Sequence, residues 1–304
     1  MKKLRKINFL GFYNVISEFK ALNKYTKIAI YVSSLIFLFL GIFDIQLWMN
    51  DSNHLLDENK NNIFKFYQAY HNKNTYINVP VINVIFQSMN IFTSITGIIA
   101  VIMVAEKAIS SFFWSVLNVI TFVIYAFNIK MLGDFQIMLF FILPVLIIGW
   151  FNWAKSQNLE FEDKKRINTP WKKIILGLII LAITALFTYL FKIELYWLHK
   201  HVAHDNYVDS TNHQVIWYDS FTSSCYIAGI ALQALKSQAQ YISWLLVNIF
   251  SVVKYMIPSD GGGSQYVLAL QSFIYLCTTF LGIYNWYIKD KIDFSALKAK
   301  FSKK

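Results

Sequence analysis

The residues best suited to binding chemistry are two tryptophan–asparagine pairs with the same spacing. Trp114 precedes Asn118, and Trp244 precedes Asn248, by four positions. On a helix, residues four apart lie on one face about one turn apart. An indole can stack on a planar ring, especially a cationic one, and a carboxamide can pair with an amide or with sugar hydroxyls. Each pair alone is equally compatible with helix packing, but its occurrence twice favours a binding site.

Other polar and aromatic side chains in apolar runs extend this set. Asp219 is compatible with ligand contact or with a position at the membrane interface. Asn152 and Asn285, each between aromatic residues, are candidate gates, with an interfacial belt as the alternative. The remaining candidates for substrate binding are Thr222, Gln233, Thr93, Tyr125 and Gln136.

The two pairs belong to a segment that occurs twice. Residues 92–94 and 221–223 both read Phe-Thr-Ser, and 149–153 and 282–286 share a Gly-aromatic-Asn-Trp pattern. Similar motifs in the same order and at similar spacing indicate a duplicated unit. A duplicated membrane unit with a polar residue at matched depth in each copy is typical of a solute carrier.

Composition predicts an all-α integral membrane protein. The 304 residues are 56% hydrophobic and only 15% charged, against about a quarter charged in soluble domains. A bilayer core needs roughly 20 apolar helical residues. Eight such runs occur, at 28–49, 81–105, 110–129, 134–154, 174–197, 217–236, 242–258 and 265–288. Pro144 predicts a local kink in the fourth run.

These runs predict a leading helix followed by a 3+1+3 arrangement. Because an odd linker helix joins two three-helix units, the repeats enter the bilayer in the same direction and are parallel. The predicted parts are 1–80 (basic segment, leading helix and external loop), 81–154 (first repeat), 155–216 (cytoplasmic loop, linker helix and external histidine-containing loop), 217–290 (second repeat) and 291–304 (basic tail).

The net charge of +11 is concentrated before the first run, in the central loop and in the tail. With eight spans, all three clusters fall on one side, so the positive-inside rule places both termini in the cytoplasm of a multi-pass plasma-membrane protein. The basic residues therefore set orientation, and we expect no nucleic-acid partner.

Enzymatic function is disfavoured. His199, His201 and His204 could suggest a metal site, but no His-Glu-x-x-His, Gly-x-Ser-x-Gly or Walker lysine occurs. We expect a solvated loop there, and no metal or cofactor.

The repeated Trp-x-x-x-Asn motif, the 3+1+3 layout and the Gly-Trp-Phe-Asn-Trp close of the first repeat resemble the PnuC-type vitamin transporters, over about residues 81–290. The resemblance implies a fold similar to SWEET proteins, homotrimers, and facilitated diffusion of nicotinamide riboside trapped inside by phosphorylation. It also implies that the two Trp–Asn pairs bind the substrate. Thiamine, riboflavin or a deoxynucleoside as substrate remains open, as does a non-transporting subunit of a multicomponent importer.

Overall fold

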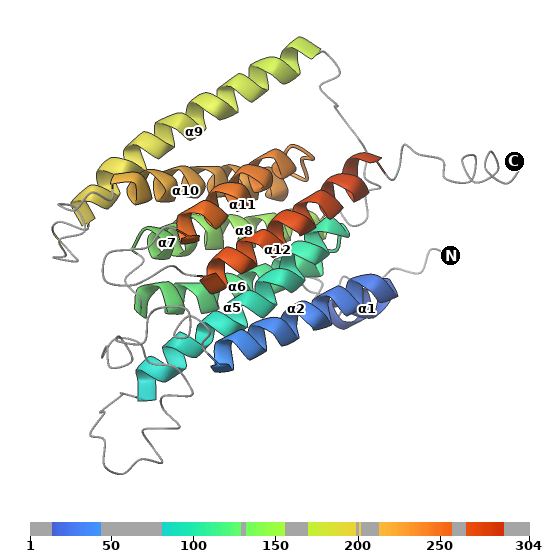
Figure 1. The fold of residues 1–304 in the computed structure, drawn as a ribbon. Helices are drawn as coiled ribbons and strands as arrows, with labels where there is room; N and C mark the ends of the chain where they lie inside the picture. Colours follow the sequence, from blue (N-terminus) through green and yellow to red (C-terminus); the bar gives the residue numbers. More distant parts are fainter. Residues whose placement is uncertain are drawn as a thin grey trace, which may run out of the picture.

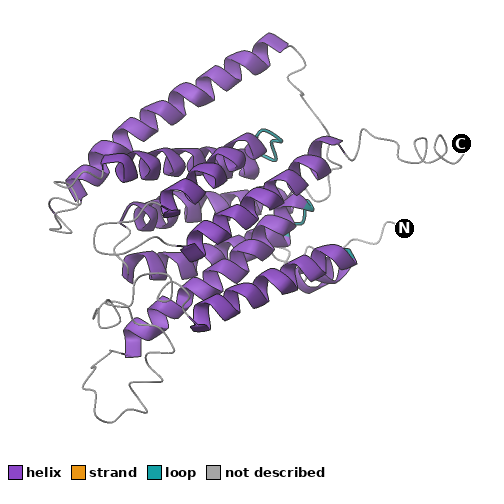
Figure 2. Cartoon of the chain, viewed as in Figure 1, coloured by secondary structure: helices purple, strands orange, loops and turns teal. Residues whose placement is uncertain are grey.

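The computed structural model describes residues 14–43, 81–128, 132–155, 170–198, 201, 213–256 and 266–288. Within them every regular element is helical (Figure 2). The helices are α1 (Asn14–Ala21), α2 (Lys24–Phe43), α5 (Val81–Ala105), α6 (Ser110–Asn128), α7 (Leu132–Ile137), η3 (Met138–Ile142), α8 (Leu143–Lys155), α9 (Pro170–Leu198), α10 (His213–Ala234), α11 (Gln240–Met256), α12 (Tyr266–Ile283) and η7 (Tyr284–Ile288). The prediction of an all-α protein is confirmed.

Two short turns, after α5 and after α10, have the same geometry. Lys107 and Lys236 adopt φ angles of 59° and 55°, in the left-handed region. The N–H of the following residue then bonds back five positions, from Ala108 to Met103 and from Ser237 to Leu232. This is the Schellman termination of a helix. It reverses the chain sharply, so α5 packs antiparallel on α6 and α10 on α11.

The helices α5, α6, α7–α8, α10, α11 and α12 pack in a closed ring, each against the next and α12 against α5. Two elements flank this ring on opposite sides, with α2 against α5 and α9 against α10 (Figure 1). The ring therefore encloses the space between α5–α8 and α10–α12.

The segment from α7 to α8 is one helical rod interrupted by the π-helical turn Met138–Ile142, directly before Leu143 and Pro144. Proline lacks the N–H that the regular helix would use, so a local change of hydrogen-bond pattern is expected beside it. The irregularity lies on the wall of the ring that faces α10.

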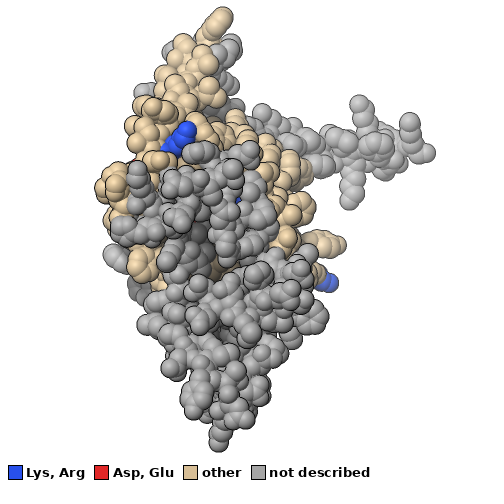
Figure 3. Space-filling model, turned by 60° about the vertical axis from the view of Figure 1, so that its left-hand side comes forward, with Lys and Arg blue, Asp and Glu red and all other residues tan. Residues whose placement is uncertain are grey.

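Four of the described helices are long and apolar enough to cross a membrane: 110–127, 133–154, 178–198 and 266–286. On the face in Figure 3, the described surface shows few Lys or Arg side chains and no Asp or Glu. These features agree with an integral membrane protein. The predicted external loop 50–79, the basic tail 291–304, and His199 and His204 lie outside the described residues.

Candidate functional site

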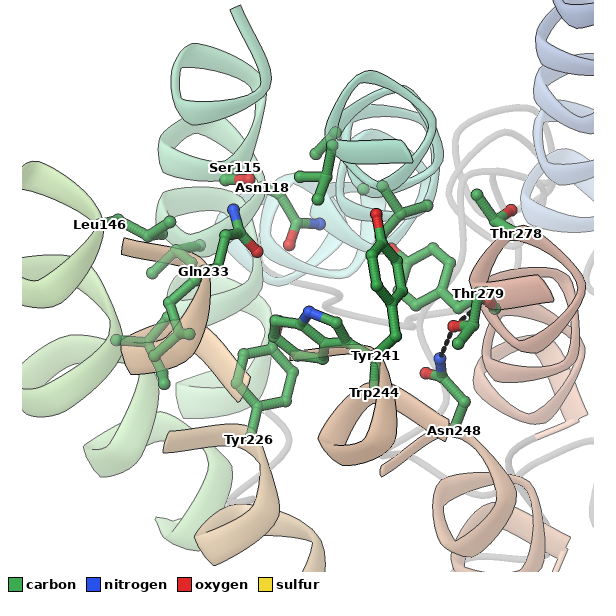
Figure 4. A pocket seen from close by; sticks show the side chains of 18 residues that line it. Ser115, Asn118, Leu146, Tyr226, Gln233, Tyr241, Trp244, Asn248, Thr278 and Thr279 are labelled. Atoms are coloured by element: carbon green, nitrogen blue, oxygen red, sulfur yellow. Dashed lines mark hydrogen bonds between the residues drawn. The ribbon is translucent and has the colours of Figure 1, made fainter. Parts of the chain in front are cut away.

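Two adjoining cavities lie inside the ring. One, of about 60 Å³, is lined by residues of α5, α6, α8, α10, α11 and α12, together with Ile142 of η3 (Figure 4). The second, of about 70 Å³, extends toward α7 and the start of α12. Asn118, Tyr226, Asn248 and Tyr275 line both cavities. The two spaces are therefore parts of one interior pathway.

The carboxamides of Asn118 and Asn248 are each oriented by a neighbouring helix. Asn118 Nδ2 donates to the carbonyl oxygen of Thr93 at 2.7 Å. Asn248 Nδ2 donates to Thr279 Oγ1 at 2.9 Å (Figure 4). An amide can make about four hydrogen bonds, so each retains its oxygen and a second N–H. The two side chains can thus offer donors and acceptors to one polar solute.

Aromatic rings form much of the remaining lining. The indole of Trp244 lies over the backbone of Gly229, where an added Cβ would be 3.2 Å from the ring. Tyr226 meets this indole edge-on, with ring centroids 5.0 Å apart and an interplanar angle of 85°. Tyr275 Oη approaches Gly97 and accepts a hydrogen bond from Gln271 Nε2 at 2.6 Å. A planar ring could therefore stack beside Trp244.

The glutamine Gln233 carries an unsatisfied polar group at the cavity. Its side chain is buried, lines the first cavity and lies near Ser115 and Asn118 (Figure 4). Its Nε2 has no hydrogen-bond partner. A buried donor without a partner costs about 1–3 kcal/mol, and a solute acceptor would relieve this cost. Thr93 and Thr222 line the second cavity.

Four predicted binding residues line neither cavity: Trp114, Tyr125, Gln136 and Asp219. Trp114 packs in a cluster with Phe19, Phe37 and Ile98, and its indole N–H is buried without a partner. Tyr125 packs against the main apolar core. Gln136 has a buried, unpartnered Nε2 on α7. The structure therefore does not bring these side chains to the cavity.

The predicted residue Asp219 belongs to a charged bridge, formed by Asp134, Asp219 and Lys254. Lys254 Nζ donates to Asp134 Oδ2 at 2.8 Å and to Asp219 Oδ1 at 2.6 Å. The bridge joins α7 to α10 and α11. Lys254 was not among the predicted site residues, although a lone charge in an apolar run is itself a signal of function.

At the other end of the pathway, two indoles cross between the halves of the ring in an arrangement we call the indole latch. Trp153 Nε1 donates to the carbonyl oxygen of Gln233 at 3.0 Å, and Trp286 Nε1 to that of Val104 at 3.2 Å. The two rings lie 6.4 Å apart. Lys236 lies over Trp153 and Lys107 over Trp286, at 5.2 and 5.4 Å from the ring centroids.

The two candidate gate residues flank this latch. Asn285 is buried, and its Nδ2 donates to the carbonyl oxygen of Ala105 at 3.2 Å. Asn152 is exposed on α8. Both lie next in sequence to a latch indole, at the far end of the pathway from the charged bridge.

Comparison with known proteins gives consistent matches. The nicotinamide riboside transporter PnuC of Haemophilus influenzae is 24% identical over 195 residues, covering 64% of this chain and 76% of that protein. The transporter of the same name from Escherichia coli is 20% identical over 199 residues, covering 62% and 80%. The crystal structure of the vitamin B3 transporter PnuC has a similar fold, with a TM-score of 0.57 at 18% identity over 87% of this chain and 91% of that one.

The family model described as "Nicotinamide mononucleotide transporter" matches residues 87–288, which include the whole ring α5–α12 except the first turns of α5. This range covers both cavities, the charged bridge and the indole latch. The chain therefore belongs to this family of membrane transporters and is not an enzyme.

Proposed function

We propose that this protein carries nicotinamide riboside across the cell membrane by facilitated diffusion. One observation carries the proposal: two oriented carboxamides, Asn118 and Asn248, and the indole of Trp244 meet at one interior cavity. The riboside has a planar cationic ring, an amide and ribose hydroxyls. The indole suits the ring by stacking and cation–π attraction, and the carboxamides suit the polar groups. The names of the relatives support this substrate.

We propose that eight helices span the bilayer and that the ring is two parallel three-helix repeats. Two packing relations support the repeat: the third helix of each half packs on the first helix of the other, α8 on α10 and α12 on α5. Two further features occur once in each half. These are the turns at Lys107 and Lys236, and the indole bonds by which the last helix of each half contacts the other half. The domain boundaries predicted from sequence follow from this division.

Transport then proceeds by rocking of the two repeats. Each cavity has room for only a few water-sized groups, so a nucleoside enters when the halves separate. The indole latch and the charged bridge connect the halves at opposite ends of the pathway. Opening one connection while the other stays closed gives alternating access, with Asn152 and Asn285 acting at the latch end.

Further proposals concern the cellular setting. The basic segments place both termini, and with them the indole latch, on the cytoplasmic side of the plasma membrane. Net uptake would come from phosphorylation of the substrate inside the cell, without ion coupling. The functional unit would be a homotrimer.

Two alternatives give different results in one assay. A PnuC-like carrier of thiamine, riboflavin or a deoxynucleoside would take up that compound instead of nicotinamide riboside. A non-transporting subunit would take up neither without a partner. The assay is uptake of radiolabelled riboside into liposomes that contain only this protein, without ATP or an ion gradient, and we expect accumulation to equilibrium.

The test variant is Asn248→Leu, which removes one carboxamide from the cavity and replaces it with an apolar side chain of nearly equal size. We expect a folded protein whose uptake falls at least tenfold. Ile249→Leu, an exposed position on the same helix, is the control and should retain uptake. Full transport by Asn248→Leu would show that this asparagine only packs helices.

A further inference from the structure

The names of the family model and of the relatives differ by one phosphate group, because one refers to a mononucleotide and the others to a riboside. A phosphate monoester adds about −1.5 to −2 charges at neutral pH. The charges near the pathway therefore bear directly on which form is accepted. Among the described residues that line the two cavities, the charged ones are Asp134 and Lys254.

The ammonium of Lys254 is held by two carboxylates at once. Its Nζ lies 2.8 Å from Asp134 Oδ2 and 2.6 Å from Asp219 Oδ1, and the three side chains are 7, 11 and 16% exposed. Gly133 lets the second carboxylate approach, since a Cβ there would lie 2.5 Å from Asp219 Oδ2. Two negative charges and one positive charge leave the bridge with one net negative charge.

We propose that the charged bridge is the charge filter of the pathway and that Lys254 sets its strength. The inference rests on the proposed function and adds to it the residues that discriminate between riboside and mononucleotide. The bridge admits cationic and neutral nucleosides and rejects phosphorylated ones. Lys254 is a specificity-determining residue because its positive charge reduces the net charge of the bridge from −2 to −1, while its ammonium remains bonded to Asp134 and Asp219.

The ammonium of Lys254 is bonded to two carboxylates and is not free to bind an anion alone. A free lysine in an interior cavity is a strong phosphate ligand. In this bridge, two of the three N–H donors of Lys254 already bond carboxylates, so a phosphate that approaches the ammonium also meets two negative charges at close range. The excess charge lies at low exposure, where an effective dielectric of about 20 gives each unit charge an effect of roughly tenfold or more on binding at 8 Å.

The bridge also lies where a solute must pass. Asp134 and Lys254 line the second cavity together with Asn118 and Asn248, which also line the first. Asp134 belongs to one half of the ring, and Lys254 and Asp219 belong to the other. A solute that separates the halves at this end therefore passes the carboxylates at close range.

A graded charge series tests the proposal. Asp134→Asn and Asp219→Asn each bring the bridge from −1 to zero, and the double variant brings it to +1, with shape nearly unchanged. Binding of three probes is measured on purified protein: nicotinamide riboside, its 5′-monophosphate, and the uncharged dihydronicotinamide riboside. Glu194→Gln, which removes an exposed carboxylate on α9 away from both cavities, is the control with the same change of charge.

We expect the preference for riboside over monophosphate to fall about tenfold or more with each carboxylate removed. Both single variants should shift it equally, and the double variant should bind the monophosphate. The dihydro compound should change little, and Glu194→Gln should match the wild type. Thermal unfolding of each variant verifies folding, and the two single variants decide the question if the double variant does not fold.

An unchanged preference in both single variants would overturn the charge filter. A shift confined to one of them would overturn it too, because it would indicate direct contact with that carboxylate. Failure of the wild type to bind any nicotinamide probe would instead count against the proposed function. The two failures are therefore distinguishable.

Discussion

Helices α6 and α11 carry the same Trp-x-x-x-Asn sequence but place the indole differently. In α11, both Trp244 and Asn248 line the cavity. In α6, Asn118 lines it, whereas Trp114 packs against an apolar cluster that includes Phe37 of α2 and Ile98 of α5. Each half thus supplies one carboxamide to the cavity, but only the second half supplies an indole.

The partner of each indole explains this difference. In the proposed repeat alignment, Tyr226 of α10 corresponds to Gly97 of α5, 129 positions earlier. Tyr226 meets Trp244 edge-on, whereas the space over Gly97 is taken by Tyr275 Oη. In the first half, the place that would correspond to Tyr226 is therefore occupied by Tyr275, which belongs to the second half. A duplicated fold can in this way bind an asymmetric solute.

The largest expected effect is the difference between the two tryptophans. Trp244→Ala should weaken binding of nicotinamide riboside about tenfold to a hundredfold, because aromatic stacking of a base contributes about 1–3 kcal/mol. Trp114→Ala should leave binding within about threefold and instead lower stability by about 2 kcal/mol, less than for a fully buried aromatic because Trp114 is only partly buried. Isothermal titration and thermal unfolding measure the two quantities.

Leucine at the same two positions serves as the control, since it retains apolar volume. Trp114→Leu should recover part of the stability, and Trp244→Leu should not recover binding. Equal loss of binding on both sides would mean that Trp114 also reaches the solute in another conformation.

The two asparagines should differ less. Asn118→Leu and Asn248→Leu should each weaken binding about tenfold, because each removes ligand hydrogen bonds. Asn248→Leu leaves a threonine hydroxyl that still bonds its own helix through Tyr275. Asn118→Leu removes the 2.7 Å bond to the Thr93 carbonyl, which still accepts from the Thr96 hydroxyl at 3.3 Å. Both variants should therefore lose a similar unfolding free energy, about 1 kcal/mol each. A much larger loss in one of them would show that its asparagine has a greater role in helix packing.

Hydropathy predicted the helices well because each span needs its own apolar run. The run predicted at 81–105 is α5, and that at 110–129 ends within one residue of α6. The orientation of Trp114 was not predictable, because the apolar cluster it packs against is built from segments far apart in the sequence, including Phe37 and Ile98. Lys254 was missed because its partners, Asp134 and Asp219, are 120 and 35 positions away.

Two glycines test whether Tyr275 and Trp244 need the space above a residue without a Cβ. A Cβ at Gly97 would lie 1.7 Å from Tyr275 Oη, whereas one at Gly229 would lie 3.2–3.3 Å from Trp244. Gly97→Ala should therefore displace Tyr275 and lower stability by about 1–3 kcal/mol, with a several-fold change in riboside affinity. Gly229→Ala should lower stability less than Gly97→Ala, because Trp244 need shift by only a few tenths of an ångström.

The double variant Gly97→Ala with Tyr275→Phe tests whether the Tyr275 hydroxyl causes the loss of stability. Removing the hydroxyl should relieve the tightest overlap and restore part of the stability, because Asn118 Nδ2 and Tyr275 Cζ would still lie 2.7 and 2.9 Å from the added Cβ. A Gly97→Ala variant as stable as the wild type would mean that Tyr275 can leave this position at no cost.

The smallest expected effect concerns how the two Trp–Asn helices begin. At α6, the N–H of Ser110 donates to Glu18 Oε2 of α1 at 2.9 Å. At α11, Ser237 of the preceding turn accepts from the N–H of Ala239 at 3.3 Å. A carboxylate at a helix N-terminus also interacts favourably with the helix dipole, so α1 contributes to the first half what a local serine contributes to the second.

Glu18→Ala should therefore lower the unfolding free energy by about 1 kcal/mol, as for loss of a helix cap, and leave riboside affinity unchanged. Glu18→Gln keeps an acceptor and should recover about half of that loss, the remainder being the dipole contribution. Ser237→Ala is the comparison on the other half and should cost less, because its bond is longer. A Glu18→Ala variant that loses affinity at full stability would show that α1 acts on the site through α6 and Asn118.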